Sequence, residues 1–368
     1  MPIQKLILVA LATSLALIVG AVTGLHSRSN LALEDARRGV GRVFGDSIPD
    51  LSDSERAQFD AGYQLFIKVW KLSEGQQRSQ NGNTCVACHM EPMPGGSGTA
   101  SRTFVLMSSR SSDIAGGHVF RRLVVNSSGE IRQRIPLEHT SRKTPSLFGL
   151  GLLEAVQDKV PVANRTANLG WRGKTMPLSD FVEKAMAVEL GLETPRFHHL
   201  ANARRPASTT ATQYPDVSAP QIQLMTQFIR LLGPPRPKSA DYMSLPGAPL
   251  FEKLGCSTCH TPMLVTGDSE IQALRHKAIF PFTDLRTHDM GLELSDCEDE
   301  SPPHCSRFRT SPLWGLSSTG PPFLHDGRAE TLEQAIVAHG GDAQTSRNAY
   351  LTLSRSDKEL LREFLNSL

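Results

Sequence analysis

The most constraining feature of the sequence is a five-residue pattern, C-x-x-C-H, which occurs twice, at residues 85–89 and 256–260. This is the attachment pattern of c-type haem, in which both thiols bind the porphyrin and the adjacent imidazole reaches the iron. A zinc knuckle would need further ligands near each pair, and a redox dithiol would not need the histidine in both copies. The sequence therefore predicts two covalently bound c-type haems. The predicted porphyrin-binding residues are Cys85, Cys88, Cys256 and Cys259, and the predicted iron ligands are His89 and His260.

Length and charge narrow the class of protein further. The 368 residues suggest two domains, and 39% hydrophobic residues suffice for globular cores. The 39 basic residues are nearly balanced by 37 acidic ones. Nucleic acid is not expected as a partner, because no basic surplus exists to replace its counterions.

The N-terminus and the two remaining cysteines indicate the compartment. Lys5 precedes an apolar run from Leu6 to Leu25, and no clear cleavage site follows it. Residues 1–25 are therefore expected to be either a signal peptide or an uncleaved membrane anchor. Both place the rest of the chain in the periplasm, either soluble or anchored to the inner membrane. In such an oxidising compartment, Cys297 and Cys305 are expected to form a disulfide.

The chain divides into a tether and two related halves. Residues 26–50 are predicted to be a tether, residues 51–233 the N-terminal haem domain and residues 246–368 the C-terminal one. A second repeated stretch supports this division, because T-P-S-L-F-G-L at 144–150 corresponds to T-S-P-L-W-G-L at 310–316. The predicted fold is mainly α, with two cytochrome c-like domains, long loops and a small β-hairpin insertion.

Local patterns place the helices and the hairpin. The hairpin is expected near residues 120–129, where a β-like run precedes Asn-Ser-Ser-Gly. The first helix is expected from Leu51, capped by Ser52 or Ser54. Further helices are expected over about 179–192, 221–232, 249–255, 331–339 and 357–365.

Beyond these patterns, the sequence resembles the bacterial di-haem cytochrome c peroxidase superfamily, and within it the branch of di-haem oxidoreductases, some of which are named thiol oxidoreductases. The resemblance is carried by the two haem motifs and by residues 142–153, 281–291, 308–316 and 323–336. It implies that the C-terminal haem transfers electrons and that the N-terminal haem meets peroxide. It also implies a small electron-donor cytochrome or cupredoxin as partner.

The resemblance implies a second ligand for the C-terminal iron. In similar enzymes a methionine lies about one helix after a His-x-Gly segment, which here is His325–Gly327. That position falls on His339, so ligation by His260 and His339 is expected. The alternative is a histidine at a helix end, stabilised there by the helix dipole.

Two further roles are carried over from the resemblance. Glu189 is the candidate acid or base at the N-terminal haem, although Lys184 departs from the glutamine of similar enzymes. Trp171 corresponds to a tryptophan that relays electrons between the haems. The alternatives are a solvated helix residue for Glu189 and a packing residue for Trp171.

The sequence matches the resembling enzymes less well at two positions, the calcium site and the distal ligand of the N-terminal iron. Some relatives bind calcium between the domains through an asparagine, but that position here is Lys143, whose charge disfavours a dication. The distal position could hold His118, His139 or no protein ligand.

Two functional hypotheses remain after the sequence alone. The first is a peroxidase-like oxidoreductase, and the second is a non-catalytic di-haem electron carrier in which both irons are six-coordinate. Thiol oxidation has little support, because no unpaired cysteine is left near either haem.

Overall fold

The computed structural model describes most of the chain from residue 45 onward. The described ranges are 45–70, 82–98, 142–156, 167–197, 216–238, 241–297 and 304–368, together with the short strands 79–80, 106–107, 119–120, 123–125 and 131–133. The N-terminal segment 1–25 and most of the tether lie outside them. No helix in the described ranges is long and apolar enough to cross a membrane.

The structure is mainly helical. Its α-helices are α2 (Asp53–Ile67), α3 (Leu150–Ala155), α4 (Leu178–Glu189), α6 (Ala219–Leu231), α7 (Gly247–Lys253), α8 (Leu316–Thr319), α9 (Leu332–Val337), α10 (Gln344–Leu351) and α11 (Arg355–Ser367). Short 3₁₀ turns are η1 (Cys85–Ala87), η3 (Tyr242–Ser244), η4 (Cys256–Thr258), η5 (Gln272–Leu274), η6 (Leu292–Leu294), η7 (His304–Ser306) and η8 (Gly341–Ala343).

The strands are short and pair only in antiparallel fashion. They are β1 (Ser79–Gln80), β2 (Leu106–Met107), β3 (Val119–Phe120), β4 (Leu123–Val125), β5 (Ile131–Gln133), β6 (Ala167–Leu169), β7 (Lys174–Met176), β8 (Leu264–Val265), β9 (Ala278–Ile279), β10 (Thr287–Asp289) and β11 (Arg307–Arg309). The predicted hairpin is β4 paired with β5. The expectation of a mainly α fold with small hairpins is confirmed.

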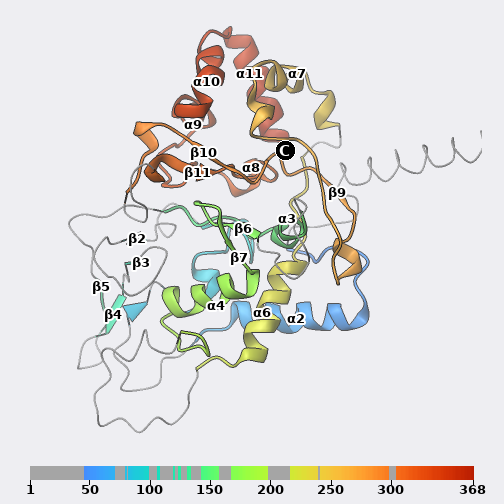
Figure 1. Ribbon diagram of the computed structural model, residues 1–368, viewed down its shortest axis with the longest axis vertical. Coiled ribbons are helices and arrows are strands. Elements are labelled where there is room, and N and C mark those ends of the chain that lie inside the picture. The colour runs from blue at the N-terminus through green and yellow to red at the C-terminus, as the bar shows by residue number, and fades with distance from the viewer. Residues whose placement is uncertain are drawn as a thin grey trace, which may run out of the picture.

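The N-terminal core is organised by two crossing helices, α2 and α6 (Figure 1). Ser52, one of the two caps that the sequence allowed, caps α2 in a capping box with Glu55. The helices touch at Gly62, where an added Cβ would lie 2.2 Å from the carbonyl oxygen of Leu224. Beside this crossing, the rings of Phe66 and Phe228 lie 5.0 Å apart.

The C-terminal core repeats this arrangement with α7 and α11. At Gly247, an added Cβ would lie 2.2 Å from the carbonyl oxygen of Leu360. The rings of Phe251 and Phe364 lie 5.4 Å apart beside the crossing. The glycine precedes the aromatic residue by four positions in both halves, so the repeat seen in the haem motifs extends to the core.

One C-terminal segment packs on the N-terminal core. The residues of η5 and β9 join the hydrophobic cluster formed by α2, α3, α4 and α6. The amide of Gly267 donates to the carbonyl of Ala155 at 2.8 Å, which fixes this segment to α3. Figure 1 shows β9 reaching down beside the N-terminal half. The halves are therefore joined by a packed segment as well as by the linker after α6.

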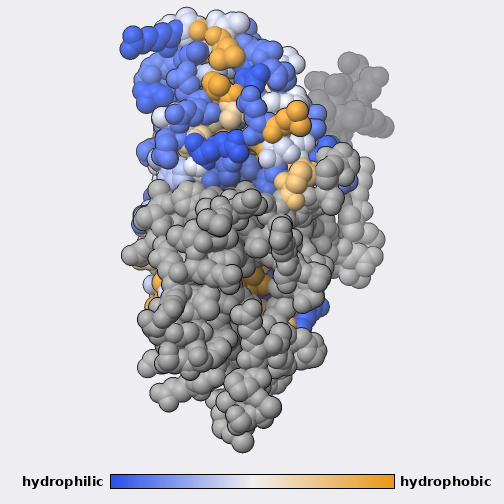
Figure 2. All heavy atoms as spheres, turned by 90° about the vertical axis from the view of Figure 1, so that its left-hand side faces the viewer, coloured by the Kyte–Doolittle hydropathy of each residue, from blue (hydrophilic) through white to orange (hydrophobic). Residues whose placement is uncertain are grey.

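The surface of the C-terminal half is mainly hydrophilic on the face seen in Figure 2, with separate apolar spots. Exposed apolar residues of this half include Leu292, Val337 and Leu351. Apolar side chains scattered in this way are ordinary at protein surfaces.

Candidate haem sites

Each C-x-x-C-H motif forms a single tight turn after the first helix of its half. In the first motif, Cys85 is the first residue of η1 and Cys88 directly follows it. In the second motif, Cys256 is the first residue of η4 and Cys259 directly follows it. The amide of His89 donates to the carbonyl of Cys85 at 3.0 Å, and that of His260 to Cys256 at 2.9 Å. The turn thus brings both thiols and the imidazole of each motif together, as attachment of one macrocycle requires.

Backbone carbonyls orient the three candidate iron ligands in the same way. The Nδ1 atom of His89 lies 3.0 Å from Gly96 O, and that of His260 lies 3.0 Å from Phe282 O. The Nδ1 atom of His339 lies 2.7 Å from Ala335 O. A hydrogen bond from Nδ1 to a carbonyl leaves Nε2 as the lone-pair nitrogen, which is the arrangement of a metal-bound imidazole.

Burial keeps these imidazoles neutral. It lowers the pKa of His89 and of His260 to about 4, and it lowers the pKa of His339 as well. Burial also raises the pKa of the Cys85 thiol to about 12 and that of Cys256 to about 11. Neutral imidazole is the form that ligates a metal, so the histidines need no proton loss near pH 7 to bind iron.

His339 faces His260. The two ring centres are 6.5 Å apart, and the rings are inclined by 49°. Two metal–nitrogen bonds of about 2.0–2.1 Å, with roughly 1.1 Å from each nitrogen to its ring centre, add up to about 6.3 Å. The gap between the rings therefore fits one metal ion held from both sides.

Local structure explains how His339 reaches this position. Helix α9 is capped by Thr331 in a capping box with Gln334, and it ends two residues before His339. The chain then passes tightly against the end of β10, since a Cβ at Gly341 would lie 2.3 Å from the carbonyl oxygen of Asp289. Glycine is required at this close approach, because any side chain there would meet the backbone.

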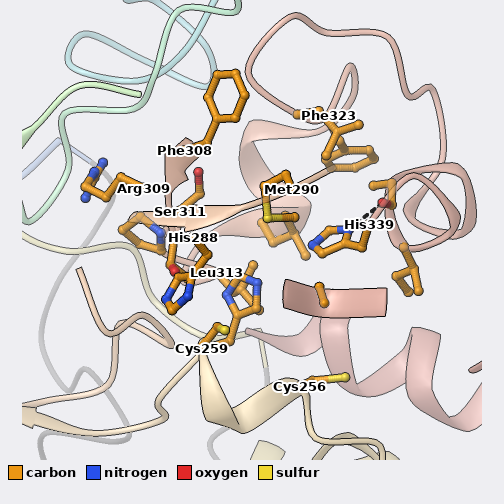
Figure 3. A pocket seen from close by; sticks show the side chains of 18 of the residues that line it. Cys256, Cys259, His288, Met290, Phe308, Arg309, Ser311, Leu313, Phe323 and His339 are labelled. Atoms are coloured by element: carbon orange, nitrogen blue, oxygen red, sulfur yellow. Dashed lines mark hydrogen bonds between the residues drawn. The ribbon is translucent and has the colours of Figure 1, made fainter. Parts of the chain in front are cut away.

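A cavity of about 680 Å³ opens beside these residues. It is lined by Cys256, Cys259, His260 and His339, and it extends to Trp171 of the N-terminal half. In Figure 3 the two cysteines lie along one side of the cavity, and His339 lies across from them. The mostly apolar cavity with its two thiols and two facing imidazoles fits a covalently attached haem.

Trp171 lies where the two halves meet. It sits in the turn between β6 and β7, and its indole Nε1 donates to the carbonyl of Lys143 at 2.9 Å. Its own carbonyl accepts from the amide of Arg309 on β11 at 2.8 Å. Trp171 thus lines the C-terminal cavity while belonging to the N-terminal half.

Glu189 lies at the end of α4, close to the start of the first motif. Its carbonyl accepts from the amide of Gly82 at 3.4 Å, three residues before Cys85. Its side chain is partly buried. By contrast, Glu183 accepts from the amide of Arg196 at 2.8 Å, so it stabilises the segment after the helix.

Lys143 stands at the position where some relatives have a calcium-binding asparagine, and where the sequence disfavoured calcium. Its buried ammonium donates to the carbonyl of Gly320 at 3.0 Å, and its amide donates to the carbonyl of His325 at 2.8 Å. Burial lowers its pKa to about 8. His118 and His139, the candidate distal ligands, lie outside the described residues.

A buried ionic cluster beside Trp171 escaped the sequence analysis. Arg142 forms an ion pair with Asp296, and both side chains are at most 6% exposed. Arg172 donates to the carbonyls of Asp296 and Cys305, and the predicted disulfide between Cys297 and Cys305 is present. The only sequence feature that pointed to this cluster is the acidic run of residues 296–300. An acidic run of this kind usually forms a solvated loop, so it did not predict a buried ion pair.

Comparison with known proteins bears on the C-terminal half. Residues 211–368 match the family model described as "Di-haem oxidoreductase, putative peroxidase". This part of the chain is therefore similar to the di-haem oxidoreductase family. The resemblance inferred from the sequence is confirmed over these residues, and it supports a di-haem redox role. The first C-x-x-C-H motif precedes the matched range. No curated protein matches the chain.

Two solved structures are similar to this chain. One is a MauG-like protein associated with microbial copper homeostasis, with 18% identity and a TM-score of 0.45 over 87% of this chain and 90% of that one. The other is the hydrazine synthase of Kuenenia stuttgartiensis, with 16% identity and a TM-score of 0.42 over 89% and 97%.

Proposed function

We propose that this protein is a periplasm-facing di-haem c-type oxidoreductase that reduces a peroxide. Electrons enter at the C-terminal site, Trp171 relays them, and the substrate is reduced at the N-terminal site. The observation that carries the proposal is the pairing of His260 with His339 across a gap that fits one metal ion. It supports an electron-transfer role for the C-terminal site, because an iron held by both imidazoles would exchange electrons rather than take up a substrate.

The chain supplies the holding residues for both groups. Cys85 and Cys88 would attach one haem, and His89 would ligate its iron. Cys256 and Cys259 would attach the other, and His260 and His339 would ligate its iron. When bound, haem supplies one-electron chemistry and, at an open coordination position, a site for peroxide.

Glu189 would move the proton that peroxide cleavage requires. The two oxygens of peroxide separate most easily when a proton passes from one to the other, and a carboxylate can carry it. The position of Glu189 beside the first motif supports this role. We expect Glu189→Gln to slow peroxide turnover by roughly 100-fold, within the range typical of general acid–base groups.

The matched control for Glu189 is Glu183→Gln on the same helix. Glu183 accepts from the backbone of Arg196, so its loss should affect local stability and leave turnover unchanged. Haem content of both variants is measured in parallel. Unaltered turnover in Glu189→Gln, with both haems bound, would remove the proposed role.

The experiment that tests the function is electron paramagnetic resonance of the oxidised and half-reduced protein. A high-spin, five-coordinate signal in either state, together with peroxide reduction, supports a catalytic site. Low-spin signals alone in both states favour the second candidate function, a non-catalytic di-haem electron carrier. A pyridine haemochrome assay and an intact mass establish beforehand whether two haems are covalently bound.

The remaining parts of the proposal concern partners and location. The donor would be a small cytochrome or a cupredoxin. Residues 1–25 would direct export or remain as an anchor in the inner membrane. Fractionation of cells that produce the full chain tests the location, and a cytoplasmic holoprotein would contradict it.

A further inference from the structure

Arg309 is a buried cation that forms no ion pair with an acidic residue in the described part of the chain. Its Nε donates to the carbonyl of Gly170 at 2.9 Å, whereas its Nη1 is buried and has no hydrogen-bond partner among the described residues. Burial lowers its pKa to about 10, so the guanidinium stays charged near pH 7. An unpaired buried charge is costly, and proteins rarely keep one without a partner.

The cavity beside Arg309 has an excess of positive charge. Among its described lining residues, four carry cationic side chains, Lys143, Lys253, Arg309 and Arg347, and one, Asp342, carries a carboxylate. The Nε of Arg347 is also buried without a hydrogen-bond partner among these residues. The lining therefore favours an occupant that is apolar in its body and negatively charged at its edge.

We propose that Arg309 binds a carboxylate of the haem held by Cys256, Cys259, His260 and His339. This inference rests on the proposed function. A c-type haem carries two propionate side chains at the edge opposite its thioether bonds, and Figure 3 shows Arg309 on the side of the cavity away from Cys256. The planar guanidinium matches a carboxylate in shape and can donate two hydrogen bonds to it.

The contact has two measurable consequences. A fixed cation near the macrocycle favours the reduced iron, because reduction lowers the positive charge at the metal. The same cation keeps the carboxylate ionised at neutral pH. Arg309 therefore holds the midpoint potential of the C-terminal haem high and nearly independent of pH between pH 6 and 8.

Spectroelectrochemical titration of the full-length holoprotein tests the contact. In Arg309→Gln, we expect the ratio of reduced to oxidised C-terminal haem at a fixed potential to fall roughly tenfold, which is about 59 mV for a one-electron couple. The potential should also become pH-dependent between pH 6 and 8, since the carboxylate then takes up a proton on reduction. Arg309→Lys keeps the charge and should restore most of the potential. Resonance Raman bands of the propionates should still shift in Arg309→Lys, because the paired hydrogen bonds are lost.

The matched control is Arg307→Gln on the same strand. Arg307 donates to the carbonyl of Thr287 and does not line the cavity, so its loss should leave the pH dependence unchanged. Unchanged potentials in Arg309→Gln with two haems bound would overturn the proposal. If that variant does not fold, unchanged propionate bands in Arg309→Lys would overturn it instead.

Two further outcomes separate this inference from its alternatives. A wild-type potential that changes with acetate concentration at constant ionic strength would assign Arg309 to a diffusible anion and overturn the proposal. A pyridine haemochrome assay and an intact mass that show fewer than two covalently bound haems would instead reject the proposed function. The two failures are therefore distinguishable.

Discussion

At the scale of single residues, His339 offers a direct test, because its ring lies opposite that of His260. A thioether ligand raises the potential of a haem relative to a second imidazole. We expect His339→Met to raise the midpoint potential of one haem within the roughly 0.8 V range that axial ligands span. The control is His276→Met, which replaces an exposed histidine and should change neither potential. If His339→Met also changes neither potential, His339 is not a ligand.

Lys143 gives a residue-scale prediction about pH. Its pKa is lowered from 10.5 to about 8 in the folded protein, because burial opposes the charged form. Between these values the unfolded chain binds more protons, so the contribution of Lys143 to stability rises as the pH rises from 8 to 10.5. Below pH 8 the full destabilisation is present.

The measurement compares wild type with Lys143→Met in denaturant titrations from pH 7 to 10.5. We expect the unfolding free energy of wild type to rise relative to the variant by about 3 kcal/mol over this range. Lys277→Met, which removes a more exposed ammonium, is the control and should show no such trend. A difference that does not vary with pH would contradict burial of a charged Lys143.

At the scale of elements, the two helix crossings depend on Gly62 and Gly247. Gly62 lies inside α2, where replacement of glycine by alanine normally favours the helix by about 0.5–1 kcal/mol, whereas Gly247 is the first residue of α7. Here an added Cβ would lie 2.2 Å from a carbonyl oxygen of the facing helix in both halves. Overpacking of this kind costs about 1–3 kcal/mol, so packing outweighs helix propensity.

We therefore expect Gly62→Ala and Gly247→Ala each to lower the unfolding free energy by about 1–2 kcal/mol. Thermal unfolding followed by circular dichroism measures the change. Ala57→Gly is the control, because Ala57 is exposed on α2 and its exchange measures the difference in helix propensity between alanine and glycine without a change in packing. A stabilised Gly62→Ala variant would mean that the two helices do not cross as closely as described.

The elements also show what the sequence could and could not reveal. The cap of α2 at Ser52, the hairpin of β4 and β5 and the last helix follow from local patterns, and they are present. The repeated crossing was missed because Phe66 precedes its cysteine motif by 19 residues, whereas Phe251 precedes its motif by only five. Local periodicity does not reveal a repeat whose parts are separated by insertions of different length.

At the scale of the whole molecule, the halves are joined by contacts that no local pattern encodes. The ion pair between Arg142 and Asp296 and the two bonds of Lys143 connect residues more than 150 positions apart. Such pairings depend on tertiary packing, so the sequence could indicate two haem motifs but not how their halves meet. The role of Trp171 came only from resemblance, and its position at this junction makes the role testable.

The substitution Trp171→Phe tests whether electrons pass between the two halves through this residue. Phenylalanine can keep the packing and the backbone bond from Arg309, but it removes the indole and its hydrogen bond to Lys143. If electrons pass through the indole, intramolecular transfer after flash reduction of the C-terminal haem should slow roughly tenfold, or about 1.4 kcal/mol in barrier. Loss of the donor should also lower stability by about 1–3 kcal/mol, because the Lys143 carbonyl loses a partner.

The rate and the stability together separate relay from packing. Trp70→Phe makes the same change at a buried tryptophan whose Nε1 has no partner among the described residues, so it serves as the control. A slower rate in Trp171→Phe but not in Trp70→Phe supports the relay. Lower stability with an unchanged rate would make Trp171 a structural residue at the junction, and electrons would then have to cross between the halves by another route.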